Sequence, residues 1–362
     1  MSERLASLRA ILVATGLDAA LVSHAANRFY LSGYTPEDHG PEESAGLLLV
    51  TGDRALLLTS PNNIKWAESE APGFDVIGWE RPWVKTVAGR IGELGCRRVG
   101  FEDRALSYAI TLALQEAING TAELSPLGNA VTDLRAIKDS AEIARIARAI
   151  RLTDEVFTNI AAQLTVGMTE REVAWRIERS FRERGADGAA FPTIVASGPH
   201  AARPHHRTGD RRIEAGEPII IDMGARLDGY NADLTRTVWI GEPDDQPRAV
   251  YNVVYDAQAA ALDTVRAGVS GADVDKAARS VLEAAGYGDQ IVHGFGHGLG
   301  IQVHEAPSAS PTSDQPLRAG EVLTVEPGLY FADWGGVRIE DVVVIEDHGC
   351  RNLTTARKKR LS

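Results

Sequence analysis

Two acidic residues flank a turn signal in the middle of the chain. Asp222 follows the apolar run at 218–221, and Asp233 lies in a second segment with the composition of a strand. Between them, positions 227–229 read Leu-Asp-Gly, which is typical of a hairpin turn. Opposed residues of an antiparallel hairpin have position numbers with a constant sum, and they point to the same face of the sheet. Asp222 and Asp233 are symmetric about this turn to within about one residue, so we expect both carboxylates to face one point.

The same construction recurs near the C-terminus. Glu326 and Glu340 lie on two apolar segments and are symmetric about Asp333, which opens the turn-forming stretch 333–336. Buried acids repel one another and lose hydration, at a cost of several kcal/mol per ion unless a cation or hydrogen-bond donors replace the water. A pair of divalent cations is the simplest compensation, so the sequence predicts a two-metal centre.

A glycine-rich segment at 293–300 supplies an imidazole for this centre, His297. Glycines let the backbone pass close to a site. Four carboxylates and one imidazole form a mainly oxygen donor set, which suits manganese or cobalt, with zinc or iron possible. The segment is not a dinucleotide-binding fingerprint, because Leu299 stands where the third glycine is required. The chain also lacks the HExxH motif of zincins and a complete serine nucleophile elbow.

The composition favours a cytoplasmic enzyme that acts on small molecules. The net charge of −12 argues against a nucleic-acid partner, because nucleic-acid binding depends first on positive charge. Two cysteines are too few for a disulfide framework and indicate a reducing compartment. Charged residues interrupt the first twenty positions, as they would not in an export signal. The apolar runs are shorter than the ~20 residues that span a bilayer, so no membrane partner is expected.

The elements that must position these residues form two domains, because 362 residues exceed the usual size of a single hydrophobic core. A break in the periodic pattern at 123–133 marks the boundary. We assign residues 1–130 to an N-terminal α/β domain and residues 131–362 to a second domain that begins with helices and continues as strands, an α+β arrangement overall. The pattern predicts helices near 2–15, 62–70, 83–94, 106–118, 140–163, 170–184, 247–267 and 271–285, and strands at 19–23, 46–50, 55–59 and 98–102.

These motifs together resemble the pita-bread metallopeptidases, the family of prolidase, aminopeptidase P, methionine aminopeptidase and the metal-free creatinase. Five segments with matching spacing are far more specific than any single motif. The resemblance covers the C-terminal ~225 residues with specific motifs, and the first ~130 residues look like the creatinase-type N-terminal domain. It implies a curved antiparallel sheet in the second domain. The matching segments are Ile221-Asp222-x-Gly224, Asp233-x-Thr235-Arg236-Thr237, Gly296-His297-Gly298-x-Gly300, Glu326-Pro327-Gly328 and Arg338-Ile339-Glu340-Asp341.

The resemblance also implies roles for individual residues. Asp222 would bind one metal, His297 and Glu326 the other, and Asp233 and Glu340 would bridge the two. Two cations would activate a water molecule as the nucleophile, and Glu326 would also move the proton. Around this centre, the family pattern implies that His205, His293 and His304 take part in catalysis and substrate binding, and that Arg338 and Tyr330 support the ligands or the end of the substrate.

The remaining histidines and arginines have simpler explanations. His206 and the four histidines without motif support (24, 39, 200 and 348) are expected to be structural or to face solvent. Arg236 and Arg338 are expected either to pair with the acids of the site or to contact substrate, and the sequence does not distinguish these roles.

The resemblance implies hydrolysis of the bond between an N-terminal residue and proline in dipeptides or short peptides. We favour an Xaa-Pro dipeptidase; an Xaa-Pro aminopeptidase that accepts longer peptides is the main alternative. Methionine aminopeptidase is disfavoured because it generally lacks the N-terminal domain. A creatinase-like C–N hydrolase or a non-catalytic pita-bread binding module is less consistent with the full set of metal ligands. The family precedent implies a homodimer.

Overall fold

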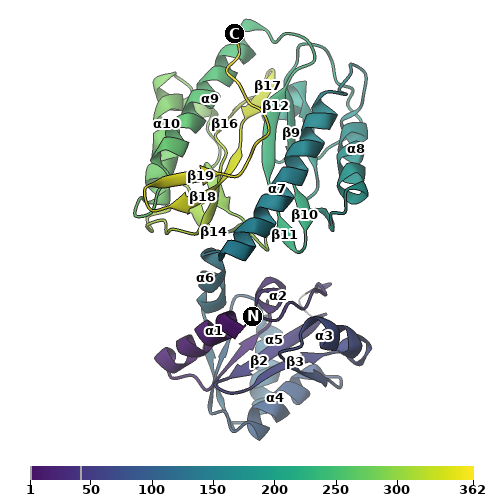
Figure 1. Ribbon diagram of the computed structural model, residues 1–362, viewed down its shortest axis with the longest axis vertical. Helices are drawn as coiled ribbons and strands as arrows, with labels where there is room; N and C mark the ends of the chain where they lie inside the picture. Colours follow the sequence, from purple (N-terminus) through teal and green to yellow (C-terminus); the bar gives the residue numbers. More distant parts are fainter. Residues whose placement is uncertain (1, 41–42) are drawn as a thin grey trace. The chain divides into compact units, whose positions relative to one another are not determined.

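The chain divides into two compact units, Met1–Arg135 and Ala136–Ser362. The computed structural model describes residues 2–40 and 43–362. The sequence placed the division after residue 130; the observed one lies near the end of helix α6 (Ala130–Ala136). Each unit combines helices with a sheet, as the α+β prediction requires (Figure 1).

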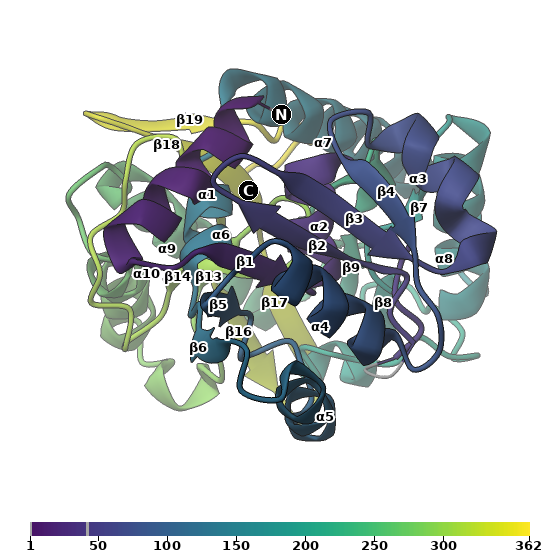
Figure 2. The ribbon, with the colours of Figure 1, turned by 90° about the horizontal axis from the view of Figure 1, so that it is seen from below.

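The first unit contains a six-stranded mixed sheet in the order β4-β3-β2-β1-β5-β6. β2 and β3 form the predicted antiparallel hairpin, and both are buried along their whole length, which explains their continuous runs of leucine. Helices α4 and α5 pack on one face of this sheet (Figure 2). The elements are α1 (Ser2–Thr15), β1 (Ala19–Val22), α2 (Ala25–Ser32), β2 (Gly46–Thr51), β3 (Ala55–Thr59), α3 (Ile64–Glu70), β4 (Asp75–Gly78), α4 (Trp83–Glu93), β5 (Arg98–Phe101), α5 (Tyr108–Ile118) and β6 (Glu123–Pro126).

The second unit opens with two helices that begin at capping boxes. Asp139 and Glu142 cap α7 (Ser140–Ala161), and Thr169 and Glu172 cap α8 (Glu170–Glu183), the second of which the sequence predicted. Both helices pack against a group of short strands: β7 (Gly188–Ala189), β8 (Ile194–Ser197), β9 (Ile219–Met223), β10 (Ala225–Leu227), β11 (Tyr230–Asn231) and β12 (Leu234–Val238). The 3₁₀ turn η2 (Gly198–Ala202) follows β8.

A second pair of helices, α9 (Asp245–Thr264) and α10 (Gly271–Ala284), packs against the remaining strands. Figure 1 shows the strands of this unit between the two helix pairs. The antiparallel ladders are interrupted at several points, which divides the sheet into short pieces. The strands are β13 (Gly296–Gly298), β14 (Glu305–Ala309), β15 (Val322–Val325), β16 (Gly328–Phe331), β17 (Gly335–Arg338), β18 (Asp341–Glu346) and β19 (Gly349–Asn352).

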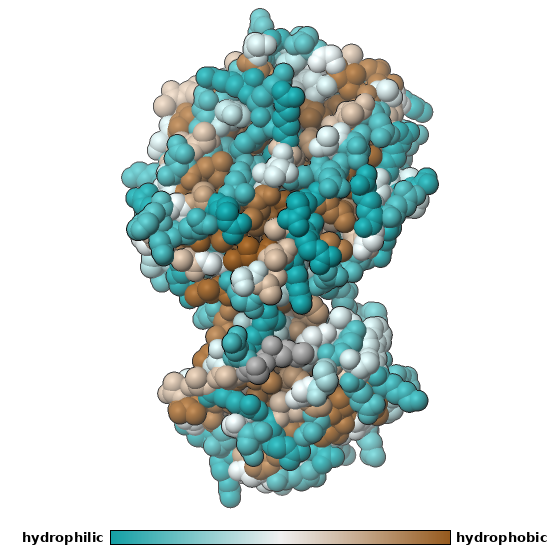
Figure 3. Space-filling model, in the orientation of Figure 1, coloured by the Kyte–Doolittle hydropathy of each residue, from teal (hydrophilic) through white to brown (hydrophobic). Residues whose placement is uncertain are grey.

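The surface and the helices bear on whether the chain could span a membrane. On the visible face of each unit, hydrophilic residues are interspersed with hydrophobic ones (Figure 3). Over residues 2–40 and 43–362, no helix combines the length and the apolar composition that crossing a membrane requires.

Candidate metal centre

The first predicted hairpin places Asp222 and Asp233 on the same side of the sheet. In the ladder between β9 and β12, the residue opposite Asp222 is Thr235. Asp233 lies two positions before Thr235, so the two aspartates are diagonal rather than direct neighbours, and they keep a common face. Gly224 leaves no room for a side chain, because a Cβ atom there would come within 1.9 Å of the carbonyl oxygen of Ala232.

The second hairpin has the register that the sequence predicted. Val325 pairs with Asp341 in one ladder and Gly328 pairs with Arg338 in the next, and both pairs have the same sum of position numbers. Glu326 and Glu340 lie between these ladders with that same sum and are therefore opposed. The interruption of the hydrogen-bonded ladder at this point coincides with the two carboxylates.

His297 joins the two hairpins on β13. Its Nε2 lies 3.4 Å from Oε1 of Glu326 and 3.6 Å from Oδ2 of Asp233. One potential ligand atom each from Asp233, His297 and Glu340 lie within 4.8 Å of one another. The predicted ligands thus converge from two hairpins and the strand β13, which are distant in sequence.

A cavity of about 840 Å³ contains this cluster. Apolar residues such as Phe191, Ile194 and Val303 line another part of its wall. The volume lies in the range of ligand-binding pockets, about 300–1,000 Å³. Nine of the ten predicted site residues line the cavity: His205, Asp222, Asp233, His293, His297, His304, Glu326, Arg338 and Glu340. The tenth, Tyr330, is buried and contacts two of them.

The environment of the cavity disfavours the charged forms of its carboxyl groups. Burial and repulsion by neighbouring carboxylates raise the pKa of Asp233 and Glu340 well above the ordinary value. Burial also raises the pKa of Glu326. Oδ1 of Asp222 and Oε1 of Glu340 are buried and have no hydrogen-bond partner among the described residues. Divalent cations would relieve the repulsion and occupy these acceptor oxygens, so the residues present fit a metal centre.

Arg338 acts as an ion-pair partner of the site. Its Nη2 donates to Oδ2 of Asp222 at 2.6 Å, and its Nε donates to Oγ1 of Thr235 at 3.1 Å. Thr235 in turn donates to Oε2 of Glu340 at 2.9 Å. A buried guanidinium with these partners fixes the orientation of two of the predicted ligands. Of the two roles left open for this arginine, pairing with an acid is the one observed, and its side chain also reaches the cavity wall.

Arg338, Tyr330 and His293 form a chain of hydrogen bonds. Nη1 of Arg338 donates to the Tyr330 hydroxyl at 2.8 Å, and that hydroxyl lies 2.9 Å from Nε2 of His293. Nδ1 of His293 lies 2.7 Å from the carbonyl of Gly294, which can only accept. His293 therefore carries its proton on Nδ1 and accepts from Tyr330 on Nε2, so both ring nitrogens are engaged within the protein. Burial raises the pKa of Tyr330 to about 12, which keeps the hydroxyl protonated for this role.

His304 and His205 complete the imidazole wall. The rings of His304 and His297 meet edge to face with centroids 4.2 Å apart. Burial and the neighbouring His297 lower the pKa of His304, which favours a neutral ring. His205 lines the same cavity on the segment that follows η2.

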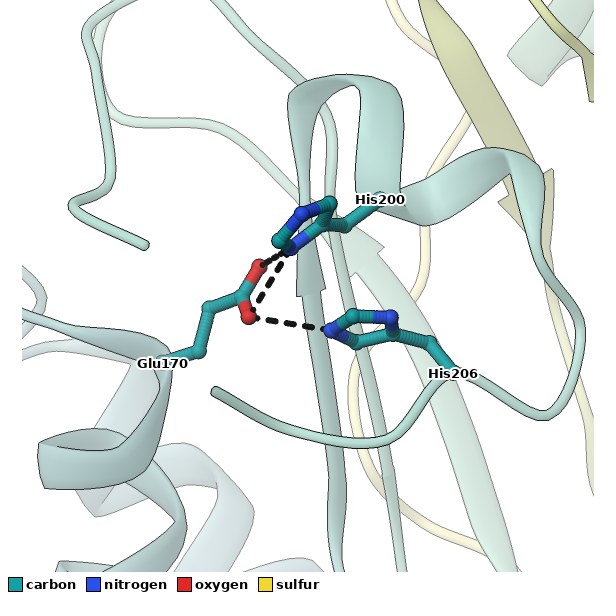
Figure 4. Close-up of side chains that lie close together, drawn as sticks. All are labelled: Glu170, His200 and His206. Atoms are coloured by element: carbon teal, nitrogen blue, oxygen red, sulfur yellow. Dashed lines mark hydrogen bonds and ion pairs between the residues drawn. The ribbon is translucent and has the colours of Figure 1, made fainter. Parts of the chain in front are cut away.

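The sequence analysis missed a second cluster beside the cavity. His200 and His206, both expected to be structural or to face solvent, converge on the buried carboxylate of Glu170 (Figure 4). His206 is buried and also lines the cavity. The only sequence signal near Glu170 was the capping box at the start of α8, which accounts for Thr169 and Glu172 but not for Glu170.

The fold and the site define a metallopeptidase. Residues 144–347 match the model of metallopeptidase family M24, and residues 4–137 match the creatinase/prolidase N-terminal domain. The chain belongs to this family, it is a peptidase, and its second unit has the predicted pita-bread fold.

Relatives that match over nearly the whole chain include Xaa-Pro dipeptidases and an X-Pro aminopeptidase. The Xaa-Pro dipeptidase of Pyrococcus furiosus is 34% identical over 100% of both chains. A solved structure of Xaa-Pro dipeptidase from Bacillus anthracis has a TM-score of 0.93 at 34% identity and covers 99% of this chain and 98% of its own. A crystal structure of X-Pro aminopeptidase from Thermotoga maritima MSB8 has a TM-score of 0.87 at 35% identity, with 96% and 97% covered.

Proposed function

We propose that this chain is an Xaa-Pro dipeptidase that depends on two divalent cations. The observation that carries the proposal is the convergence of four carboxylates and His297 in one cavity, with two carboxylate oxygens left without a partner among the residues described. The dipeptidase relatives, which match along the full chain, support the substrate class.

The ligand roles follow the family pattern. Asp222 would hold one cation, His297 and Glu326 the other, and Asp233 and Glu340 would bridge them. When bound, the cations would lower the pKa of a water molecule and stabilise negative charge on the substrate oxygen. Oxygen-rich donors favour manganese, with cobalt, zinc or iron as the alternatives.

The family pattern also assigns the proton transfer of the reaction to Glu326. Its carboxylate lines the cavity, with Oε1 3.4 Å from Nε2 of His297. It would take a proton from the attacking water and deliver it to the proline nitrogen as the peptide bond breaks. His304 and His205 supply imidazoles to the same cavity, where an N–H group can stabilise the developing oxyanion.

His293 would act differently from these two histidines. Because both of its nitrogens are engaged within the protein, we assign it a packing role against the substrate rather than hydrogen-bond donation. Tyr330 and Arg338 would hold it in place from behind.

Aminopeptidase activity on longer peptides is the second candidate, and the full-length similarity to the T. maritima enzyme favours it. The manganese-loaded protein should be incubated with Leu-Pro, with Leu-Pro-Gly and with Leu-Ala as a control without proline. Cleavage of Leu-Pro alone supports the dipeptidase, and cleavage of Leu-Pro-Gly supports the aminopeptidase. If neither proline peptide is cleaved with manganese or with cobalt, the proposal is refuted, whatever happens to Leu-Ala.

Three accompanying proposals concern the state of the enzyme. We expect manganese to give the highest activity of the four metals, a homodimer in light scattering, and a cytoplasmic location in fractionated cells. The cysteine content and charge support the last of these.

A further inference from the structure

Glu170 is a fully buried carboxylate at the first position of α8. Its Oε1 accepts from the backbone N–H and the hydroxyl of Ser197, both at 2.9 Å. Its Oε2 accepts from the backbone N–H of Gly209 at 3.3 Å. The carboxylate therefore ties the start of a helix to the end of β8 and to the segment that follows His206.

Two histidines complete the shell of this carboxylate. Nδ1 of His200 lies 2.9 Å from Oε1, and Nε2 of His206 lies 3.0 Å from Oε2 (Figure 4). Burial alone would raise the pKa of Glu170, but hydrogen bonds from Ser197, His206 and His200 outweigh it and lower this pKa. An ionised carboxylate only accepts, so each facing nitrogen carries its proton. His200 is then the Nδ1–H tautomer and His206 the Nε2–H tautomer.

The same three side chains have the composition of a metal site, and their potential ligand atoms lie within 4.8 Å of one another. Two observations favour hydrogen bonding instead. Both carboxylate oxygens already accept from backbone N–H groups, those of Ser197 and Gly209. The contacts to the two imidazoles also have ordinary hydrogen-bond lengths.

This cluster is connected to the cavity through the segment 203–207. His206 lines the cavity beside His205, a residue proposed above to act on the substrate. On the other side, Nη1 of Arg338 lies 3.4 Å from the carbonyl oxygen of Pro204 while Nη2 holds Asp222. The segment is therefore held at two points, by Arg338 near the predicted metal ligands and by Glu170 away from them.

We propose that Glu170 is a positioning residue for the reaction: acting through His206 and His200, it fixes the segment that carries His205 at the cavity. The inference rests on the proposed function for the role of His205. The position of a group that stabilises a transition state matters strongly, since a displacement of about 1 Å can cost on the order of 10²-fold in rate. Glu170→Gln keeps the size and one acceptor oxygen, but its NH₂ group cannot accept from His206.

A double-mutant cycle tests this inference. We expect Glu170→Gln to lower kcat for Leu-Pro about tenfold with a smaller change in KM, since the lost interaction acts in the transition state. His205→Ala should lower kcat by about 10²-fold, and the double variant should be no slower than His205→Ala alone. Multiplicative losses in the double variant would overturn the inference, because they would show that Glu170 acts independently of His205.

The matched control is Asp154→Asn in α7. Asp154 is also buried and also accepts from the backbone N–H and the hydroxyl of one residue, Thr355. Both Asp154→Asn and Glu170→Gln should lower the thermal stability, but Asp154→Asn should leave kcat unchanged. An equal fall in kcat in this control would reduce the role of Glu170 to general stability and overturn the inference.

Two measurements do not depend on activity. Nitrogen-15 spectra of histidine-labelled protein should show the Nδ1–H tautomer for His200 and the Nε2–H tautomer for His206, and Glu170→Gln should change both. Metal analysis should give the same metal content for the wild type and Glu170→Gln; a metal ion lost in the variant would overturn the inference in favour of a metal site. If the wild type cleaves no Xaa-Pro peptide, the proposed function fails, while the tautomers still decide whether this hydrogen-bonded cluster exists.

Discussion

Replacing Asp233 by asparagine should have opposite effects on the metal-free and the metal-loaded protein. Ligand oxygens of Asp233 and Glu340 lie within 4.8 Å of each other. At an effective dielectric constant of about 20, two unit charges at that distance repel by about 3.5 kcal/mol. The raised pKa of both groups shows that part of this repulsion is already relieved by protonation. We therefore expect Asp233→Asn to stabilise the metal-free protein by about 1–2 kcal/mol, or about 2–8 °C in melting temperature for a unit of this size.

With metal bound, the same change removes a bridging ligand. Saturation of the wild type at about 100 times the Kd should add about 2.7 kcal/mol of stability, and most of this gain should disappear in the variant together with bound metal. Calorimetry with chelator and with manganese, combined with metal analysis, measures both effects.

The matched control is Asp228→Asn, which removes the same charge from the turn of the same hairpin. Asp228 has a positive φ of 52°, which asparagine tolerates, and a half-exposed side chain paired with Arg148. Its melting temperature should change little in either state. The reasoning would be refuted if Asp233→Asn were less stable than the wild type without metal. It would also be refuted if the manganese-treated variant kept its full metal content.

Two further predictions concern protonation and the hydrogen-bond chain. Because the pKa values of Asp233, Glu326 and Glu340 lie above their ordinary values, the stability that these protonated groups contribute is present in acid and is lost as pH rises through the raised values. As pH rises above the ordinary carboxyl range of about 4, the melting temperature of chelator-treated protein should therefore fall relative to that of the manganese-loaded protein. Parallel curves in calorimetry would contradict this. Tyr330→Phe should cost about 1–3 kcal/mol in urea unfolding, because it leaves Nε2 of His293 without its partner and Nη1 of Arg338 with only the 3.4 Å contact to Pro204. Tyr108→Phe, at an exposed site, is the control, and an equal change in both variants would contradict the prediction.

The sequence predicted those parts of the site that depend on local geometry. The symmetry of Glu326 and Glu340 about Asp333 follows from the constant sum of an antiparallel register, and the structure has that register. For Asp222 and Asp233 the predicted symmetry centre was one position too early. The turn determines the register, and the observed centre lies after Asp228, so that Asp222 is opposite Thr235. The common face survived because a two-residue offset preserves the side of a strand.

The contacts made by buried polar side chains could not be predicted in this way. Glu170 and His206 are 36 positions apart and carry no shared motif. Their convergence depends on how α8 packs against β8, which is a tertiary contact without a local signature. The engagement of both nitrogens of His293 likewise depends on Tyr330, which lies 37 positions away.

The separation of the two hairpins along the chain determines when the carboxylates can meet. The hydrogen bond from Thr235 to Glu340 spans 105 positions, and that from Arg338 to Asp222 spans 116. Closing such long loops is a late, entropically costly event, while each hairpin forms from neighbours. Neither hairpin alone holds the full ligand set, so we expect the complete cation site to exist only after the hairpins have docked. The rate at which a refolding chain binds its metals would then measure how fast these two hairpins dock.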